Sequence, residues 1–387
     1  MSTIDFSRHP LFVPHRDPSS GIVSYLLTPP GHPQRLAPLM QNFYFVNSSI
    51  TPDERWLWLT CAYPPNPLKS LAVVSLDPDN PVIRHFPQSA EQTGNSGVAR
   101  DGGCYFAIGP SIYHIDTDGR TTCRFTLPES YINGRQVVRL ITHISLSADG
   151  RLILIDGQVG DTWFVGTADL QAAPDRAFSL IKEFPFNHNH GQFSPIDNDL
   201  FVLAHDHTRV GNSGAYFHHN VRTVLMNRAN TRYDFLTPHR YNAHHIGPSH
   251  EWWSPDGWLC YVDYQLGAFE ISPQNLANVH NIAPSELATR VWPTELCHAH
   301  CNRDRTLWVA DESPYKWHLK PCEVRFFDRR SGVTKLIASM PEPNAPRRGY
   351  HLDPHPQFSP QDNFVCYTST VSGGSPTVAV VPVSTLV

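Results

Sequence analysis

SADGRLILID (residues 147–156) and SPDGWLCYVD (residues 254–263) share one pattern, an Asp-Gly turn followed by an apolar run. Aspartate and glycine tolerate the left-handed backbone of tight turns, while β-branched and aromatic residues favour strands. Similar turns recur at seven aspartates: Asp53, Asp101, Asp149, Asp197, Asp256, Asp304 and Asp362. The successive intervals are 48, 48, 48, 59, 48 and 58 residues. The chain is therefore a series of seven similar units.

Each unit has room for four short strands. The first unit shows them as FYFVNSSI (43–50), RWLWLTCAY (55–63), LAVVSLD (71–77) and PVIRHF (81–86). Among 387 residues, 35 prolines and 23 glycines divide the chain into segments too short for long helices. Four antiparallel strands in roughly 40–50 residues are typical of a propeller blade. We expect an all-β, seven-bladed β-propeller with four strands per blade, formed by residues 1–387 as a single domain. A solenoid or a sandwich is the alternative, because ring closure is not visible in a sequence.

The two ends of the chain suggest how the ring closes. The last unit has only three clear strands and ends in TVAVVPV (377–383). The head of the chain offers an unassigned strand in GIVSYLLTPP (21–30). We therefore expect residues 22–28 to complete blade seven, so that an N-terminal strand closes the last blade.

The overall charge and hydropathy of the chain argue against nucleic acid or a membrane as its partner. A net charge of −5 gives no basic field for nucleic acid, and no apolar stretch approaches the ~18 residues of a membrane span. The N-terminal residues lack the basic and apolar regions of a secretion signal, which predicts a cytoplasmic protein without a membrane partner. Eight cysteines, among them Cys61, Cys260 and Cys366 in similar apolar runs, are interpreted as core residues in a reducing compartment. The oligomeric state is not indicated.

One column of the repeat is rich in histidine. Six residues before the turn aspartate, or seven in units four and seven, stand Asn47, Asn95, His143, His190, His250, His298 and His355. The first strand of a propeller blade lines the central channel, so this column predicts a ring of side chains around one axis. Converging imidazoles can bind a metal or transfer protons near neutral pH. The alternative is a polar channel whose histidines only bond to neighbouring blades.

The approach to the seventh turn, APRRGYHLDPHPQFSP (345–360), concentrates reactive side chains. His351, Asp353 and His355 alternate along an extended segment, where every second residue shares a face. Arg348 precedes them and could pair with a carboxylate. A mixed histidine and carboxylate site suits manganese or a similar divalent ion.

The sixth unit offers a competing arrangement. In ELCHAHCNRD (295–304), His298 and His300 alternate and are flanked by Cys297 and Cys301. A structural zinc site with thiolate ligands is the weaker interpretation, because the usual second pair of close cysteines is missing.

Five segments carry a resemblance to a known family: HGQFSP (190–195), NVRTVLMN (220–227), SHEWWSPDGWLCYVD (249–263), HAHCNRDRTLWVADES (298–313) and HPQFSPQDNFVCYTS (355–369). They resemble the blade openings of the oligogalacturonate lyases, which are seven-bladed propellers that bind Mn²⁺ and cleave short uronate oligomers. The resemblance covers most of the repeat region and is strongest from 188 to 362.

The resemblance implies roles for single residues. His298 matches the family's isolated metal-binding histidine, and His355 matches the last ligand of its blade-seven cluster. His250 matches the proposed catalytic base, and Arg222 matches the arginine near the substrate.

The blade-seven cluster departs from the family. The family pattern is glutamine, two residues, histidine, one residue, histidine, whereas this chain has Tyr350, Asp353 and His355 at those places. We expect His298 and His355 to bind a divalent cation, with Asp353 or His351 completing the site.

The expected activity is β-elimination on a small acidic oligosaccharide, with His250 as the base and Arg222 facing the carboxylate. The candidates for holding the sugar are His143, His190, Arg348 and Tyr350. One alternative is another enzyme on the same frame, either a lyase for a different uronate glycan or a metal-dependent isomerase or hydrolase of a small acid. The other is a binding propeller without catalysis, because a fold does not specify a function.

Overall fold

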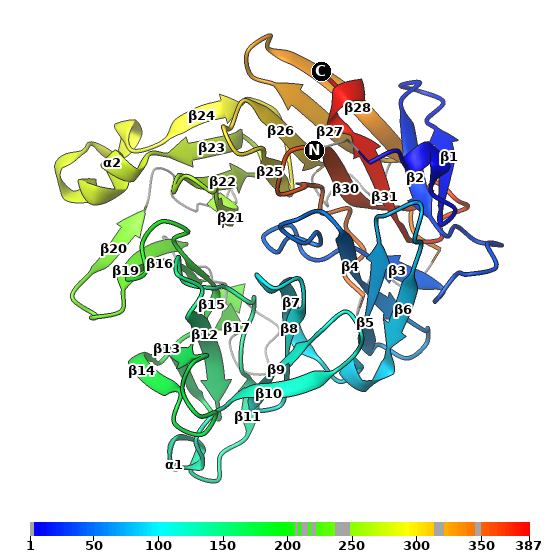
Figure 1. The fold of residues 1–387 in the computed structure, drawn as a ribbon. Coiled ribbons are helices and arrows are strands. Elements are labelled where there is room, and N and C mark those ends of the chain that lie inside the picture. The colour runs from blue at the N-terminus through cyan, green and yellow to red at the C-terminus, as the bar shows by residue number, and fades with distance from the viewer. Residues whose placement is uncertain are drawn as a thin grey trace.

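Seven antiparallel β-sheets follow one another around a ring (Figure 1). The computed structural model describes residues 4–205, 222–236, 248–312, 321–344 and 350–387, together with the backbone at 208–209 and 216–217. Six of the sheets have four strands and the seventh has five. The seven-bladed all-β propeller predicted from the repeats is confirmed.

The strands of the first four blades follow the chain. Blade one comprises β3 (Leu39–Gln41), β4 (Trp56–Ala62), β5 (Lys69–Ser75) and β6 (Ile83–Phe86). Blade two comprises β7 (Thr93–Val98), β8 (Cys104–Ile108), β9 (Ser111–Ile115) and β10 (Thr121–Thr126). Blade three comprises β11 (Val137–Arg139), β12 (Leu152–Val159), β13 (Thr162–Asp169) and β14 (Phe178–Phe184), and blade four comprises β15 (His188–Phe193), β16 (Leu200–His205), β19 (Thr223–Asn227) and β20 (Tyr233–Leu236). A separate two-stranded sheet between β16 and β19 pairs β17 (Thr208–Arg209) with β18 (Tyr216–Phe217).

Blades five and six repeat the arrangement. Blade five comprises β21 (Pro248–Trp253), β22 (Leu259–Asp263), β23 (Gly267–Ile271) and β24 (Thr289–Trp292), and blade six β25 (Ala299–Cys301), β26 (Leu307–Asp311), β27 (Cys322–Asp328) and β28 (Val333–Met340). Helices in the described ranges are short: α1 (Glu129–Ile132), α2 (Pro273–Ala277) and the 3-10 turns Phe6–Arg8, Pro87–Ser89, Val279–Asn281, Pro284–Glu286 and Val383–Thr385. None of these helices has the length and hydropathy needed to cross a bilayer.

Blade seven joins the two ends of the chain. Its strands are β29 (Gln357–Phe358), β30 (Phe364–Ser369), β31 (Thr377–Pro382), β2 (Val23–Leu27) and β1 (Phe12–Arg16), in that order across the sheet. Tyr25 pairs with Val380, and Leu26 with Ala379. Figure 1 shows the N-terminal strands in blue beside the C-terminal strands in red. The predicted closure by residues 22–28 is confirmed, and β1 adds a fifth strand that the repeat pattern did not indicate.

The repeated turns are built alike. The Asp149 carboxylate accepts a hydrogen bond from the Ser147 hydroxyl at 2.6 Å, and Asp256 accepts the equivalent bond from Ser254 at 2.6 Å. Gly150, which follows Asp149, has a φ of 75°. Glycine adopts this left-handed conformation without a steric cost, which explains why Asp-Gly marks the turn.

The first strand of blade one differs from the prediction. The expected strand FYFVNSSI does not form as one strand, because β3 ends at Gln41 and pairing with β4 resumes only at its end, where Ile50 bridges Leu57. Tyr44 and Phe45 are buried against a cluster that includes Trp252 on blade five and Trp308 on blade six. The aromatic side chains therefore cross the channel and pack on the far side of the ring. Burial of these rings outweighs the strand propensity of the segment.

Candidate metal and catalytic site

Backbone irregularities orient several of the channel histidines. The pairing register shifts around His190 in β15 and around His250 in β21. These two residues have φ values of 53° and 51°, and His351 and His355 have values of 49° and 46°. Residues other than glycine seldom adopt this left-handed conformation, and β-bulges re-aim the side chains they carry. Such local strain is concentrated at functional sites.

The histidines converge on one aromatic ring that sequence reasoning missed. The Tyr44 ring centroid lies 4.7 Å from that of His355, 4.9 Å from His143, 5.6 Å from His298, 5.7 Å from His351, 6.0 Å from His190 and 6.3 Å from His250. Tyr44 is buried, and burial raises the pKa of its phenol well above the usual value. The phenol therefore stays protonated, and its ring forms a common surface for imidazoles of blades three to seven.

Four side chains form a group suited to a divalent cation. One ligand atom from each of His298, His351, Asp353 and His355 lies within 4.8 Å of the others. His351 Nε2 is 3.0 Å from Asp353 Oδ2. His355 Nε2 is buried and makes no hydrogen bond to any residue that the structure describes. A buried lone pair of this kind fits a metal ligand, and three imidazoles with one carboxylate suit manganese or another first-row divalent ion.

The pKa shifts of Asp353 and His355 also favour metal binding. Burial raises the pKa of Asp353, but the hydrogen bond from His351 and the neighbouring histidine charges outweigh it and hold the pKa well below its usual range. Burial lowers the pKa of His355 well below that of a free imidazole. An ionised carboxylate and a neutral imidazole are the forms that bind metals.

Asp311 orients the cluster from behind. Its Oδ2 lies 2.9 Å from His298 Nδ1, and its Oδ1 accepts the His298 backbone N–H at 2.7 Å. The carboxylate holds a proton on Nδ1 and leaves Nε2 as the ligand atom, as in many carboxylate–histidine–metal arrangements. Asp311 also accepts the backbone N–H of His355 at 3.2 Å. One buried carboxylate thus ties blade six to blade seven.

Asp311 could have been found from the repeat. It stands seven residues after the turn Asp304, as Asp156 stands seven residues after Asp149. Asp156 has the equivalent place in blade three, where it accepts the backbone N–H groups of Thr142 at 2.6 Å and Gly191 at 3.0 Å. A second column of the alignment, which also holds Asp263, therefore marks buried acids, and Asp156 and Asp311 join the inner ends of adjacent blades.

His250 has the tautomer of a base. Its Nδ1 lies 2.6 Å from the Cys297 carbonyl oxygen, and because a carbonyl only accepts, Nδ1 carries the proton. Nε2 therefore keeps the lone pair, with the Tyr264 hydroxyl 3.3 Å away. Burial lowers the pKa of His250 well below its usual value, so the ring is neutral near pH 7. Its ring stacks on that of His298 at 4.1 Å.

Arg222 is held by a glutamate that sequence reasoning also missed. Arg222 Nε donates to Glu251 Oε1 at 2.8 Å, and both side chains are buried. The Thr223 hydroxyl donates to the same oxygen at 2.8 Å. Glu251 directly follows His250 in the sequence, so one bulged strand carries the candidate base and the residue that orients the candidate arginine.

Structural comparison identifies the architecture. An oligogalacturonate lyase in complex with manganese superposes with a TM-score of 0.72 at 17% identity, covering 96% of both chains. An oligogalacturonate lyase from Vibrio parahaemolyticus gives a TM-score of 0.71 at 16% identity over 96% of both chains. The chain has the fold of the oligogalacturonate lyases. No protein-family model matches the sequence, and no curated protein matches it.

The oligogalacturonate lyase resemblance of the blade motifs is thereby confirmed for the fold. The remaining sugar-binding candidates are placed unequally. His143 and His190 lie in the channel with their ring centroids 4.7 Å apart, and Asn95 donates to His143 Nδ1 at 3.0 Å. Arg348 lies outside the described residues.

Tyr350, which replaces the glutamine of the oligogalacturonate lyase pattern, points away from the cluster. Its hydroxyl donates to the Asn66 carbonyl at 2.9 Å, and its ring packs with Leu39, Ala62 and Leu352. The sugar contact expected of this phenol is not supported by its position. The hydroxyl is satisfied by a blade-one loop, a contact that the spacing of the motif could not reveal.

The two cysteines of the sixth unit, Cys297 and Cys301, lie in different surroundings. Cys297 Sγ lies 3.9 Å from His298 Nε2 and forms a second possible ligand group with His250 and His298. Cys301 is buried in the hydrophobic cluster shared with Cys260. The flanking thiols therefore do not converge as the zinc interpretation requires.

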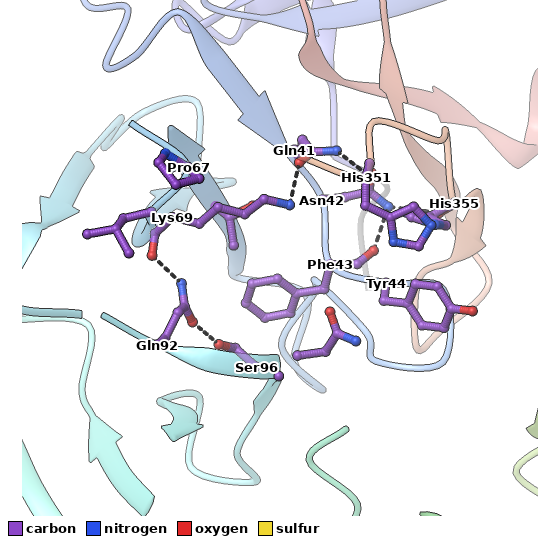
Figure 2. Close-up of a pocket in the computed structure, with 14 residues that line it drawn as sticks. Gln41, Asn42, Phe43, Tyr44, Pro67, Lys69, Gln92, Ser96, His351 and His355 are labelled. Carbon is purple, nitrogen blue, oxygen red and sulfur yellow. Dashed lines mark hydrogen bonds between the residues drawn. The ribbon is translucent and has the colours of Figure 1, made fainter. Parts of the chain in front are cut away.

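A cavity of about 240 Å³ opens beside the cluster, towards blades one and two. It is lined by His351, His355 and Tyr44 on one side and by Lys69 and Gln92 on the other (Figure 2). Two of the four candidate metal ligands, His351 and His355, therefore line a polar hollow on the blade-one side.

Proposed function

We propose that the protein is a lyase that cleaves short uronate-containing oligosaccharides of the oligogalacturonate kind by β-elimination. The observation that carries this proposal is the contact between His250 and His298, whose rings stack at 4.1 Å. It puts a neutral imidazole beside a group of side chains suited to a divalent cation. The shared fold with oligogalacturonate lyases, one of them a manganese complex, supports the proposal.

The reaction defines what the site must provide. A base removes the proton on C5 of the uronate, α to the carboxylate. The freed electron pair forms the C4–C5 double bond, the C4–O4 bond breaks, and the leaving oxygen takes up a proton. The enolate-like dianion that develops is unstable unless its charge is neutralised. Cleavage therefore needs a base and positive charge close together.

His250 is the proposed base. Its Nε2 lone pair accepts the C5 proton, and a neutral imidazole with an accessible lone pair is the form that general base catalysis requires. The Cys297 carbonyl, 2.6 Å from Nδ1, stabilises the imidazolium that forms. Tyr264 lies on the Nε2 side of the ring and is in position to orient the lone pair.

Arg222 and the cluster supply the charge. Arg222 is proposed to face the uronate carboxylate, in an orientation that Glu251 maintains. The proposed ligands of Mn²⁺ or another divalent cation are His298, His355, Asp353 and His351. Such a cation, when bound, neutralises charge on the substrate carboxylate as the dianion develops. His143 and His190 are the proposed contacts for sugar hydroxyls.

A second candidate is a lyase or isomerase for another acidic sugar that uses the same residues. The observation that favours it is the position of Tyr350, whose phenol bonds to Asn66 where the related pattern has a glutamine. We also propose a cytoplasmic location, because none of the eight cysteines, all of which lie in the described residues, forms a disulfide, and seven of them are buried.

Incubation of the purified protein with a panel of uronate oligomers tests the proposal. We expect an increase in ultraviolet absorbance from an unsaturated product, dependent on a divalent cation and lost with chelator. Cleavage of a different uronate only would support the second candidate. Binding of oligomers without any unsaturated product would indicate a non-catalytic propeller.

A further inference from the structure

Lys69 begins β5 and places a cation in the cavity beside the cluster. Its Nζ donates to Gln41 Oε1 at 3.0 Å and to the Tyr350 carbonyl oxygen. Both acceptors are neutral. Figure 2 shows the ammonium directed towards Gln41, with His351 beyond it.

The charge of Lys69 has no counter-ion in the described part of the chain. Burial alone accounts for the pKa of its ammonium, which falls to about 8, and no carboxylate opposes this shift. Lysine heads usually reach water, and enclosing one without an anion is unfavourable. A ligand carboxylate would supply both the missing charge and a charge-assisted hydrogen bond.

Hydrogen bonds hold Lys69 relative to the cluster. Gln41, which accepts from Nζ, donates through Nε2 to the His351 carbonyl at 2.9 Å. The Gln92 amide donates to the Lys69 backbone carbonyl at 2.9 Å (Figure 2). The ammonium is therefore tied to the segment that carries His351 and Asp353, and its distance from that segment is set.

The cavity suits one sugar unit. Its volume of about 240 Å³ is below the ~300–1,000 Å³ of typical ligand pockets. Its remaining lining is rich in amide and hydroxyl groups, from Asn42, Thr60, Asn95 and Ser96. Such groups can bond to sugar hydroxyls, which leaves the lysine as the group that recognises charge.

Lys69 and Arg222 lie on different sides of the ring. Lys69 belongs to blade one, whereas Arg222 directly precedes β19, the third strand of blade four, and contacts Glu251 of blade five. We propose that Lys69 binds the carboxylate of the uronate next to the one that is cleaved, so that the cavity selects oligomers with two adjacent acidic sugars. This inference rests on the proposed function and adds a specificity-determining residue to it.

Binding to the metal-free protein tests the inference without turnover. The probes are digalacturonate and its two mono-methyl esters, measured by calorimetry. We expect one ester to bind the parent protein about tenfold or more weakly than the diacid, the scale of a charge-assisted hydrogen bond. Lys69→Met should lower the affinity for the diacid by the same factor and leave the affinity for that ester unchanged. Lys69→Arg should retain most of the preference for the diacid over the ester.

Lys182→Met is the matched control, because Lys182 is also half-buried but lies over the Tyr233 ring in blade four. It should change none of the affinities. Lys69→Gln, with an unfolding curve for each variant, replaces Lys69→Met if that variant does not fold. Equal losses for diacid and ester, or no loss, would overturn the inference.

The two proposals fail differently. Lys69-dependent binding without any unsaturated product would contradict the proposed lyase activity and support the second carboxylate site. Turnover that does not distinguish the diacid from either ester would support the lyase and contradict the second carboxylate site.

Discussion

The channel has two unlike sides that share one position of the repeat. In blades one and two this position holds Asn47 and Asn95, and in the other blades it holds histidine. Asn47 Nδ2 donates to the Ile144 carbonyl at 2.7 Å, so its amide joins blade one to blade three. His355, in contrast, keeps a buried Nε2 free of hydrogen bonds to the described residues. The same place in the fold joins two blades at Asn47 and, at His355, presents an imidazole nitrogen suited to a metal.

Removing a metal ligand from the histidine side should have the largest effect. We expect His298→Ala to abolish activity, because the cation loses the ligand that Asp311 orients. Elemental analysis after purification without chelator should show a loss of bound metal. Retention of both metal and turnover would show that the cluster does not bind the cation.

Removing the base should leave the metal in place. We expect His250→Ala to lower kcat by roughly a hundredfold or more, the scale of a lost general base, with little change in binding. Steady-state kinetics together with metal analysis separate this result from the first. Near-normal kcat would assign the base elsewhere, with His190 as the next candidate.

Asp311→Asn should weaken the metal site without removing a ligand. An amide can still accept a hydrogen bond, but it stabilises His298 less as a metal ligand, and we expect about 10–100-fold lower metal affinity. Competition with a metal indicator measures this loss. Asp156→Asn, at the equivalent place in blade three, should leave metal affinity unchanged.

The pH dependence of binding should depend on Lys69. Because burial lowers its pKa to about 8, the ammonium loses its proton as the pH rises through that value. Uronate carboxylates stay ionised there, so digalacturonate should bind about tenfold more weakly at pH 9 than at pH 7. Lys69→Arg should remove this dependence, because arginine stays protonated. An unchanged pH profile in that variant would assign the titration to another group.

The asparagine side should show the smallest effect on function. We expect Asn47→Ala to reduce the free energy of unfolding by about 1–3 kcal/mol, because the Ile144 carbonyl loses its buried donor. Metal content and kcat should stay at the parent values. Thermal or denaturant unfolding measures the first effect, and loss of metal in this variant would remove the distinction between the two sides.

The sequence by itself determined the repeat architecture. Asp-Gly turns and apolar strands are local features, and seven copies of them predict the blade count, as the strand GIVSYLLTPP predicts the closure. The histidine column followed from the same periodicity, because residues at one place in each repeat occupy one place around the axis. Where the sequence pattern is periodic, the local chemistry of the residues was sufficient to predict the structure.

Only the tertiary structure decided which side chains meet across the ring. Tyr44 packs against histidines of five other blades, Glu251 orients Arg222, and Lys69 reaches the backbone of Tyr350. The most distant pair, Tyr44 and His355, is 311 positions apart in the chain. These contacts depend on the packing of whole blades, and no local propensity or spacing encodes them.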